Sequence, residues 1–173
     1  MALRRPGVRI PLGPQNKCNR SLVLEGGLCL RSFIMETNQQ PTIQEIEVLT
    51  AFLPRLYAED FSPVINWEGG KQKDGTYILP YPHYHSLVDE FFRAVASGGW
   101  IDFEYKPEQA SQMLKDETFI KTASLSQIKT MLTFCLRGER FSDGHWAEMI
   151  EEGYIRRLLE RLNEIKSELQ NRL

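Results

Sequence analysis

Apolar residues recur every three or four positions along most of the chain between residues 42 and 169, and this spacing constrains the fold most strongly. It places the apolar side chains on one face of an α-helix, which must be covered by packing against another element. The clearest segments are 43–56, 87–95, 125–136 and 155–169. We therefore expect a mainly α fold, an irregular single-domain helical bundle in which these four segments surround Trp and Phe side chains, with at most a minor extended or hairpin element.

Two capping patterns mark where helices begin. Thr42 with Glu45, and Ser124 with Gln127, match the capping box, in which two side chains three positions apart bond each other's backbone N–H groups. Pro54 predicts a kink or an early end of the first helix, because proline lacks an N–H and its ring crowds the preceding turn.

Weaker patterns separate the long helices. Residues 61–84 are interrupted by prolines and glycines, which favours a small hairpin or an ordered loop. Residues 100–105 alternate apolar and acidic side chains, which favours a short extended strand. Short helices are expected over 107–115 and around 146–150, with Gly153 as a left-handed C-terminal cap of the second one.

Residues 1–34 differ from the rest of the chain. They contain three prolines, four glycines and scattered basic residues without helical or strand periodicity, so we expect a disordered leader. The peptide Gly7–Pro11 can be encoded by the T-arm consensus of a transfer RNA gene, which indicates an over-extended reading frame and a native start at Met35. Residues 35–173 then form the single helical domain. The alternative is a genuine basic arm that binds nucleic acid or lipid headgroups.

The charge balance argues against nucleic acid as a partner. The chain has a formal net charge of −2, and leaving out residues 1–34, which hold six basic residues and one acidic residue, takes it to −7. An acidic domain repels phosphate backbones. No apolar run suits a membrane span or a signal peptide, and three cysteines without a CxxC pair are typical of a reducing compartment. We expect a soluble cytoplasmic protein with no nucleic-acid partner, no membrane partner and no cofactor.

The densest group of polar side chains lies in the segment RGERFSDGHW, residues 137–146. It places Arg137, Glu139, Arg140, Asp143 and His145 in the turn between two apolar helices. We consider this polar cluster the candidate functional or structural site of the chain.

At this segment the chain resembles a known family. LTFCLRGERFSDGHWAEMIEEGYIRRLLERL, together with the upstream ILPYPHYHSLVDEFF, is similar to the bacterial domain-of-unknown-function family 6508. The resemblance extends over most of residues 42–163 and leaves residues 1–34 outside. It implies no assigned activity. The residues that carry it are Arg140, Phe141, Asp143, Gly144 and His145, with the closing Arg161 and Leu162.

Two interpretations of the polar cluster remain open. In the structural one, Asp143 or Ser142 caps the following helix, the arginines pair with Glu139 or Asp143, and aromatic side chains fill the core. In the functional one, Arg137 and Arg140 clamp an anion and His145 is an acid–base group, because guanidinium groups fit phosphate or carboxylate and imidazole titrates near neutral pH.

A metal site is a further alternative, because His83 and His85 would face one side of an extended segment and His145 could complete three imidazole ligands. An H-x-H pair beside prolines and tyrosines is more typical of a surface or a helix start, so we expect no metal. No complete catalytic signature is present, and Cys135 falls on an apolar helix face, where burial is expected.

The sequence therefore favours a small cytoplasmic interaction or regulatory domain without its own catalysis. A protein partner is compatible with this hypothesis, and the oligomeric state is left open. The alternative is a small enzyme or an anion- or ligand-binding protein that uses the segment Arg137–Trp146.

Overall fold

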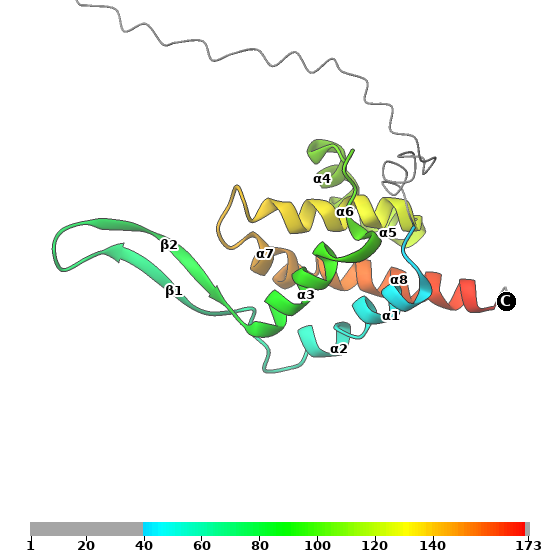
Figure 1. Ribbon diagram of the computed structural model, residues 1–173, viewed down its shortest axis with the longest axis horizontal. Helices are drawn as coiled ribbons and strands as arrows, with labels where there is room; N and C mark the ends of the chain where they lie inside the picture. Colours follow the sequence, from blue (N-terminus) through cyan, green and yellow to red (C-terminus); the bar gives the residue numbers. More distant parts are fainter. Residues whose placement is uncertain (1–39, 172–173) are drawn as a thin grey trace, which may run out of the picture. The chain divides into compact units, whose positions relative to one another are not determined.

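The computed structural model describes residues 40–171, all of which belong to one compact unit (Figure 1). The predicted leader, residues 1–34, and the proposed start at Met35 lie outside the described residues. The fold is mainly α with a single two-stranded antiparallel hairpin, as the sequence predicted. In chain order the elements are α1 (Ile43–Thr50), α2 (Leu53–Leu56), β1 (Val64–Lys71), β2 (Tyr77–Tyr84), α3 (Ser86–Ala96), the 3₁₀ turn η2 (Gly98–Trp100), α4 (Pro107–Lys115), α5 (Glu117–Thr122), α6 (Leu125–Gly138), α7 (His145–Glu151) and α8 (Tyr154–Gln170).

Both predicted capping boxes are present. At the start of α1 the Thr42 backbone N–H donates to Glu45 Oε2 at 2.7 Å, and the Glu45 N–H donates to Thr42 Oγ1 at 3.2 Å. The other oxygen of Glu45 accepts the N–H of Gly99 at 3.0 Å, which ties the start of α1 to the turn after α3. Ser124 and Gln127 form the equivalent pair at the start of α6.

The predicted helix interruptions are also confirmed. Helix α1 ends at Thr50, and Pro54 lies in the first turn of the short helix α2, where its missing N–H needs no partner. Gly153 adopts a left-handed conformation with φ of 73° directly after α7, and this allows α8 to begin without an intervening loop.

Helices α1, α3, α6 and α8 surround the core, as expected, and α7 adds a further face. Helix α8 packs against α1, α5, α6 and α7. The apolar stripes of these helices are buried almost completely, so packing accounts for the periodicity of the sequence. The largest fully buried side chains are Trp100, Phe91, Phe92, Ile46, Leu49, Leu56, Leu114, Ile120, Ile128, Met131, Leu132 and Ile155.

Two local expectations were wrong. Residues 100–105 form no strand, because Trp100 is buried in the core at the end of η2 and the following backbone bonds to side chains. The N–H of Asp102 donates to Thr133 Oγ1 at 2.9 Å, and the N–H of Glu104 donates to Asp102 Oδ1 at 3.0 Å. Helix α5 was not predicted. Asp116 begins it by accepting two backbone N–H groups on its carboxylate.

The expected hairpin extends from the helices in Figure 1. Strand β1 pairs with β2 in an irregular register, from Val64 opposite Tyr84 to Lys71 opposite Tyr77, with a shift on each side of residues 66–68. Its side chains are largely exposed, including six large apolar ones. We call these six the hairpin surface: Ile65, Trp67, Tyr77, Ile78, Leu79 and Tyr81.

Within residues 40–171, none of the helices combines the length and the apolar character that crossing a membrane would require.

Candidate functional site

Glu139, the residue directly after α6, organises the turn that leads to α7. Its Oε1 accepts the hydroxyl of Tyr84 at 2.6 Å and the backbone N–H of Gly144 at 3.1 Å. Its Oε2 accepts the backbone N–H of Trp146 at 2.9 Å. Both oxygens therefore satisfy donors that hold the start of α7 and the base of the hairpin together. The expectation that Asp143 or Ser142 caps α7 was wrong, since Gly144 is the capping residue and the carboxylate comes from Glu139.

Aromatic rings reinforce this attachment of the hairpin. The ring of Trp146 stacks on that of Phe92 of α3, with 4.5 Å between the ring centroids. The ring of Tyr84 also contacts Trp146, in a tilted arrangement with 5.3 Å between the centroids. The Trp146 indole N–H donates to the carbonyl of Leu136 at 3.1 Å. Burial, with the adjacent Glu139, raises the pKa of Tyr84, so its hydroxyl stays protonated and remains a donor. Trp67 closes over Gly144, where an added Cβ would collide with its ring.

His145 is buried beneath α6. Its ring lies against Gly138, the position where an added Cβ would fall within 2.2 Å of the imidazole, and packs edge-on to Phe134. Burial lowers the pKa of His145, and Glu148, whose carboxylate is 4.0 Å from Nδ1, acts in the opposite direction. Among residues 40–171, its Nε2 finds no hydrogen-bond partner. The imidazole is therefore held as a neutral, packed ring.

Arg137 and Arg140 lie on a different side of the same turn. They line an open cavity of about 490 Å³ together with Glu139 and Trp146. The Arg137 guanidinium packs over the ring of Tyr105, at 5.0 Å from its centroid, and more distantly over Phe103. Within residues 40–171, no carboxylate lies within 4.0 Å of either guanidinium, so the predicted ion pairs with Glu139 or Asp143 are not formed.

The structure thus divides the predicted cluster. Arg137, Glu139 and Arg140 share one cavity, whereas Asp143 is exposed and His145 is not part of the cavity wall. An acid–base role of His145 toward an anion held by the two arginines therefore has no support in this geometry. Phe141 does not fill the core, since 88% of its surface is exposed.

The three histidines of the alternative metal site are in separate environments. His83 Nε2 lies 3.1 Å from Glu68 on the hairpin, and His85 Nδ1 accepts the N–H of Leu87 to cap α3. His145 is buried under Gly138. The described part of the chain contains no group of three His, Cys, Asp or Glu side chains that could hold a metal ion.

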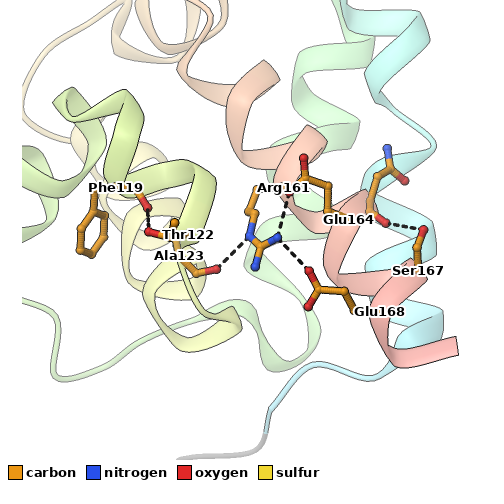
Figure 2. A network of polar contacts seen from close by, with 8 residues as sticks. Phe119, Thr122, Ala123, Arg161, Glu164, Ser167 and Glu168 are labelled. Atoms are coloured by element: carbon orange, nitrogen blue, oxygen red, sulfur yellow. Dashed lines mark hydrogen bonds and ion pairs between the residues drawn. The ribbon is translucent and has the colours of Figure 1, made fainter. Parts of the chain in front are cut away.

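Cys135 and Arg161, two further residues considered in the sequence, stabilise the packing of the helices. Cys135 is fully buried on α6, as expected, and burial raises the pKa of its thiol. Arg161 of α8 reaches the end of α5, where its Nε donates to the carbonyl of Ala123 at 3.2 Å (Figure 2). Its Nη1 also donates to Glu164 at 2.8 Å and to Glu168 at 3.1 Å. Arg161 therefore secures α8 against α5 and lies apart from the α6–α7 turn.

Sequence reasoning missed the aromatic residues that complete the site. Tyr84 belongs to the segment PYPHYHSL, whose histidines alone were considered as site residues, and its contact with Glu139, 55 residues further along the chain, has no local signal in the sequence. Phe103 and Tyr105 belong to the predicted strand that does not form. Their contact with Arg137 depends on tertiary packing and has no local signature.

The comparison with known proteins gives a family and no activity. No curated protein matches the chain, and no solved structure matches it. The model of one family, described as a family of unknown function, matches residues 41–168, which include all the elements of the α6–α7 turn and the hairpin. The chain therefore belongs to the family of unknown function DUF6508.

Proposed function

We propose that the chain is a non-catalytic interaction domain that contacts a second copy of itself through the hairpin surface. The observation that carries this proposal is the exposure of the six apolar side chains, which ranges from 41% to 74%. Soluble domains rarely expose contiguous apolar patches beyond a few hundred Å² unless the patch is used. The helices bury their apolar stripes, so the hairpin is where unburied apolar surface is concentrated in the described residues.

Side chains alternate between the two faces of a strand, so Tyr77, Leu79 and Tyr81 share one face of β2, whereas Ile78 lies on the other. At on the order of 200 Å² for a fully exposed side chain, these three present roughly 360 Å² on one face, the size of the apolar patches that monomers often use for function. One partner contributes about 800 Å² to an interface of standard size, so this face would supply the apolar centre of such an interface. Interfaces between identical subunits are the more apolar class, which favours a second copy over a charged or transient partner.

The polar residues of the α6–α7 turn support the absence of catalysis. Glu139 uses both carboxylate oxygens to bind neighbouring donors, and His145 is packed away from the cavity. The bacterial and cytoplasmic setting belongs to the same proposal. It is supported by the free, buried thiol of Cys135, which suits a reducing compartment, and by the acidic charge of the domain, which disfavours nucleic acid.

Sedimentation of the full chain over a range of concentrations tests this function. We expect a monomer–dimer equilibrium in the wild type, and its loss in the double variant Ile78→Ser, Leu79→Ser, which changes two exposed side chains without a hydrogen bond to lose. The matched control is Val48→Ser on α1, which removes a comparably exposed apolar side chain from another surface. A wild-type chain that stays monomeric at all concentrations, or a control that dissociates equally, would overturn the proposal.

A further inference from the structure

The cavity beside the α6–α7 turn combines an apolar wall with two cationic groups. Its apolar lining comes from the loop after η2, from α6 and from α7, through Ile101, Phe103, Leu136 and Trp146. Ala96 adds to the apolar lining, and the charged lining consists of Arg137, Arg140 and Glu139. With a volume of about 490 Å³ it falls within the size range of small-molecule sites, about 300–1,000 Å³.

Neither arginine of the cavity forms an ion pair within residues 40–171, although the acidic Glu139 lines the same cavity. Among the other arginines of the described chain, Arg55, Arg157 and Arg161 form ion pairs, whereas Arg93 and Arg156 do not. Arg137 and Arg140 have no carboxylate within 4.0 Å in residues 40–171, although Glu139 lies between them in the sequence. Its two oxygens are already bonded to Tyr84, Gly144 and Trp146.

The position of Arg137 is fixed by stacking. Its guanidinium lies over the rings of Tyr105 and Phe103 within cation–π distance, and this contact occupies none of its N–H donors with a hydrogen bond. Planar guanidinium donors bind carboxylate and phosphate oxygens in pairs. An anchored arginine therefore has less side-chain freedom to lose when it binds an anion.

We propose that this cavity binds a small organic anion, with an aromatic or branched apolar body against Trp146, Leu136 and Phe103 and an oxyanion, phosphate or carboxylate, between Arg137 and Arg140. The apolar wall of the cavity favours a ligand with an apolar body, and the unpaired guanidinium groups favour a ligand with a negative charge. None of the lining residues belongs to the hairpin surface, so this site and the proposed self-association can fail independently.

Calorimetric titration of the full chain with phenyl phosphate tests the site, with inorganic phosphate and phenol as the two halves of the probe. Benzoate in a parallel titration distinguishes a carboxylate ligand from a phosphate ligand. We expect phenyl phosphate or benzoate to bind at least about tenfold more tightly than phosphate or phenol, because only the whole molecule contacts both parts of the cavity. Binding of neither aryl anion above its halves would overturn the proposal.

Variants locate the binding. Arg140→Gln and Arg137→Gln are each expected to weaken the aryl anion by about tenfold or more, because each removes a charge-assisted hydrogen-bond donor. Arg140 is exposed and its side chain forms no polar contact within residues 40–171, so Arg140→Gln remains informative even if Arg137→Gln loosens the loop around Phe103. Arg55→Gln on α2 removes the same charge from a distant surface and is expected to bind normally. Equal weakening by Arg55→Gln, or unchanged binding by Arg140→Gln, would contradict the site.

Discussion

The helical body and the hairpin use apolar residues in opposite ways. In the helices, side chains such as Phe91, Leu132 and Leu158 are fully buried, and the capping boxes at the starts of α1 and α6 satisfy the first free N–H groups. In the hairpin, Ile65, Leu79 and their neighbours are exposed although the strands are well paired. The two regions belong to one compact unit, so the exposure is a property of the hairpin and not of a loosely packed chain.

The difference separates residues that the fold needs from residues that it does not. Burying a side chain such as leucine contributes about 1.5–3 kcal/mol to folding, whereas a side chain that stays exposed contributes little. The helical pattern is therefore explained by stability alone. The apolar residues of the hairpin have no such explanation within residues 40–171, which is why we propose that they contact another molecule.

The most direct way to break this comparison is to truncate one leucine in each region. Leu132→Ala leaves a cavity among fully buried side chains and is expected to lower the free energy of unfolding by about 2–5 kcal/mol. Leu79→Ala, at a side chain that is 74% exposed, is expected to change it by less than about 0.5 kcal/mol. Urea denaturation of dilute protein measures both. A similar loss in the two variants would show that the hairpin is part of the core.

The sequence predicted one side of this comparison better than the other. Helices follow from local information, because apolar spacing and capping boxes act within a few residues, and the starts of α1 and α6 were predicted at Thr42 and Ser124. The strand over 100–105 failed because alternation alone cannot supply a partner strand, and the side chain of Thr133 took the backbone donor instead.

The candidate site was predicted in its residues and not in their contacts. The sequence placed Arg137, Glu139 and Arg140 in one turn, and they do share a cavity. It could not show that the hydroxyl of Tyr84, far away in the chain, would donate to the carboxylate of Glu139. That hydrogen bond depends on how the hairpin packs on the α6–α7 turn. For the same reason Asp143 or Ser142 was expected to cap α7, although both are exposed.

The attachment of the hairpin to the helices can be tested at Glu139. Glu139→Ala removes an acceptor for three donors and is expected to lower the free energy of unfolding by about 2–3 kcal/mol. Tyr84→Phe keeps the ring on Trp146 but loses the hydroxyl, for an expected cost of about 1 kcal/mol. Asp143→Ala is the matched control in the same turn. A larger loss in Asp143→Ala than in Glu139→Ala would contradict the assignment of the capping acid.

Gly138 offers a test whose sign is unusual. Replacing a helical glycine with alanine normally stabilises a protein by about 0.5–1 kcal/mol. Here the added methyl group would meet the buried ring of His145, so Gly138→Ala is expected to destabilise by about 1–3 kcal/mol. The same substitution in a His145→Ala background should lose this penalty, and thermal or urea unfolding of the four proteins gives the coupling. Additive effects would mean that the ring moves aside freely.

The smallest expected effect is the pH dependence that His145 gives to the helical body. Burial lowers the folded-state pKa of His145 from its ordinary value of 6.5, so the unfolded chain binds more protons as the pH falls below 6.5. Stability is therefore full above pH 6.5 and declines as the pH falls toward the lowered value. Unfolding measured between about pH 8 and about pH 5.5 avoids the main titration of the carboxylates, and His145→Asn is expected to flatten the slope in this range.

Glu148 is the largest of three effects that oppose burial at this histidine, the others being the charge of Glu139 and a backbone hydrogen bond with Phe134. The carboxylate of Glu148 favours the protonated imidazole and so opposes the effect of burial. Glu148→Gln is therefore expected to lower the pKa of His145 further and to steepen the loss of stability on acidification. If the wild-type protein instead gained stability between about pH 8 and about pH 5.5, the charged neighbours would outweigh burial. The ring beneath Gly138 would then be a cation paired with Glu148, and the description of α7 as anchored by a neutral packed imidazole would have to be abandoned.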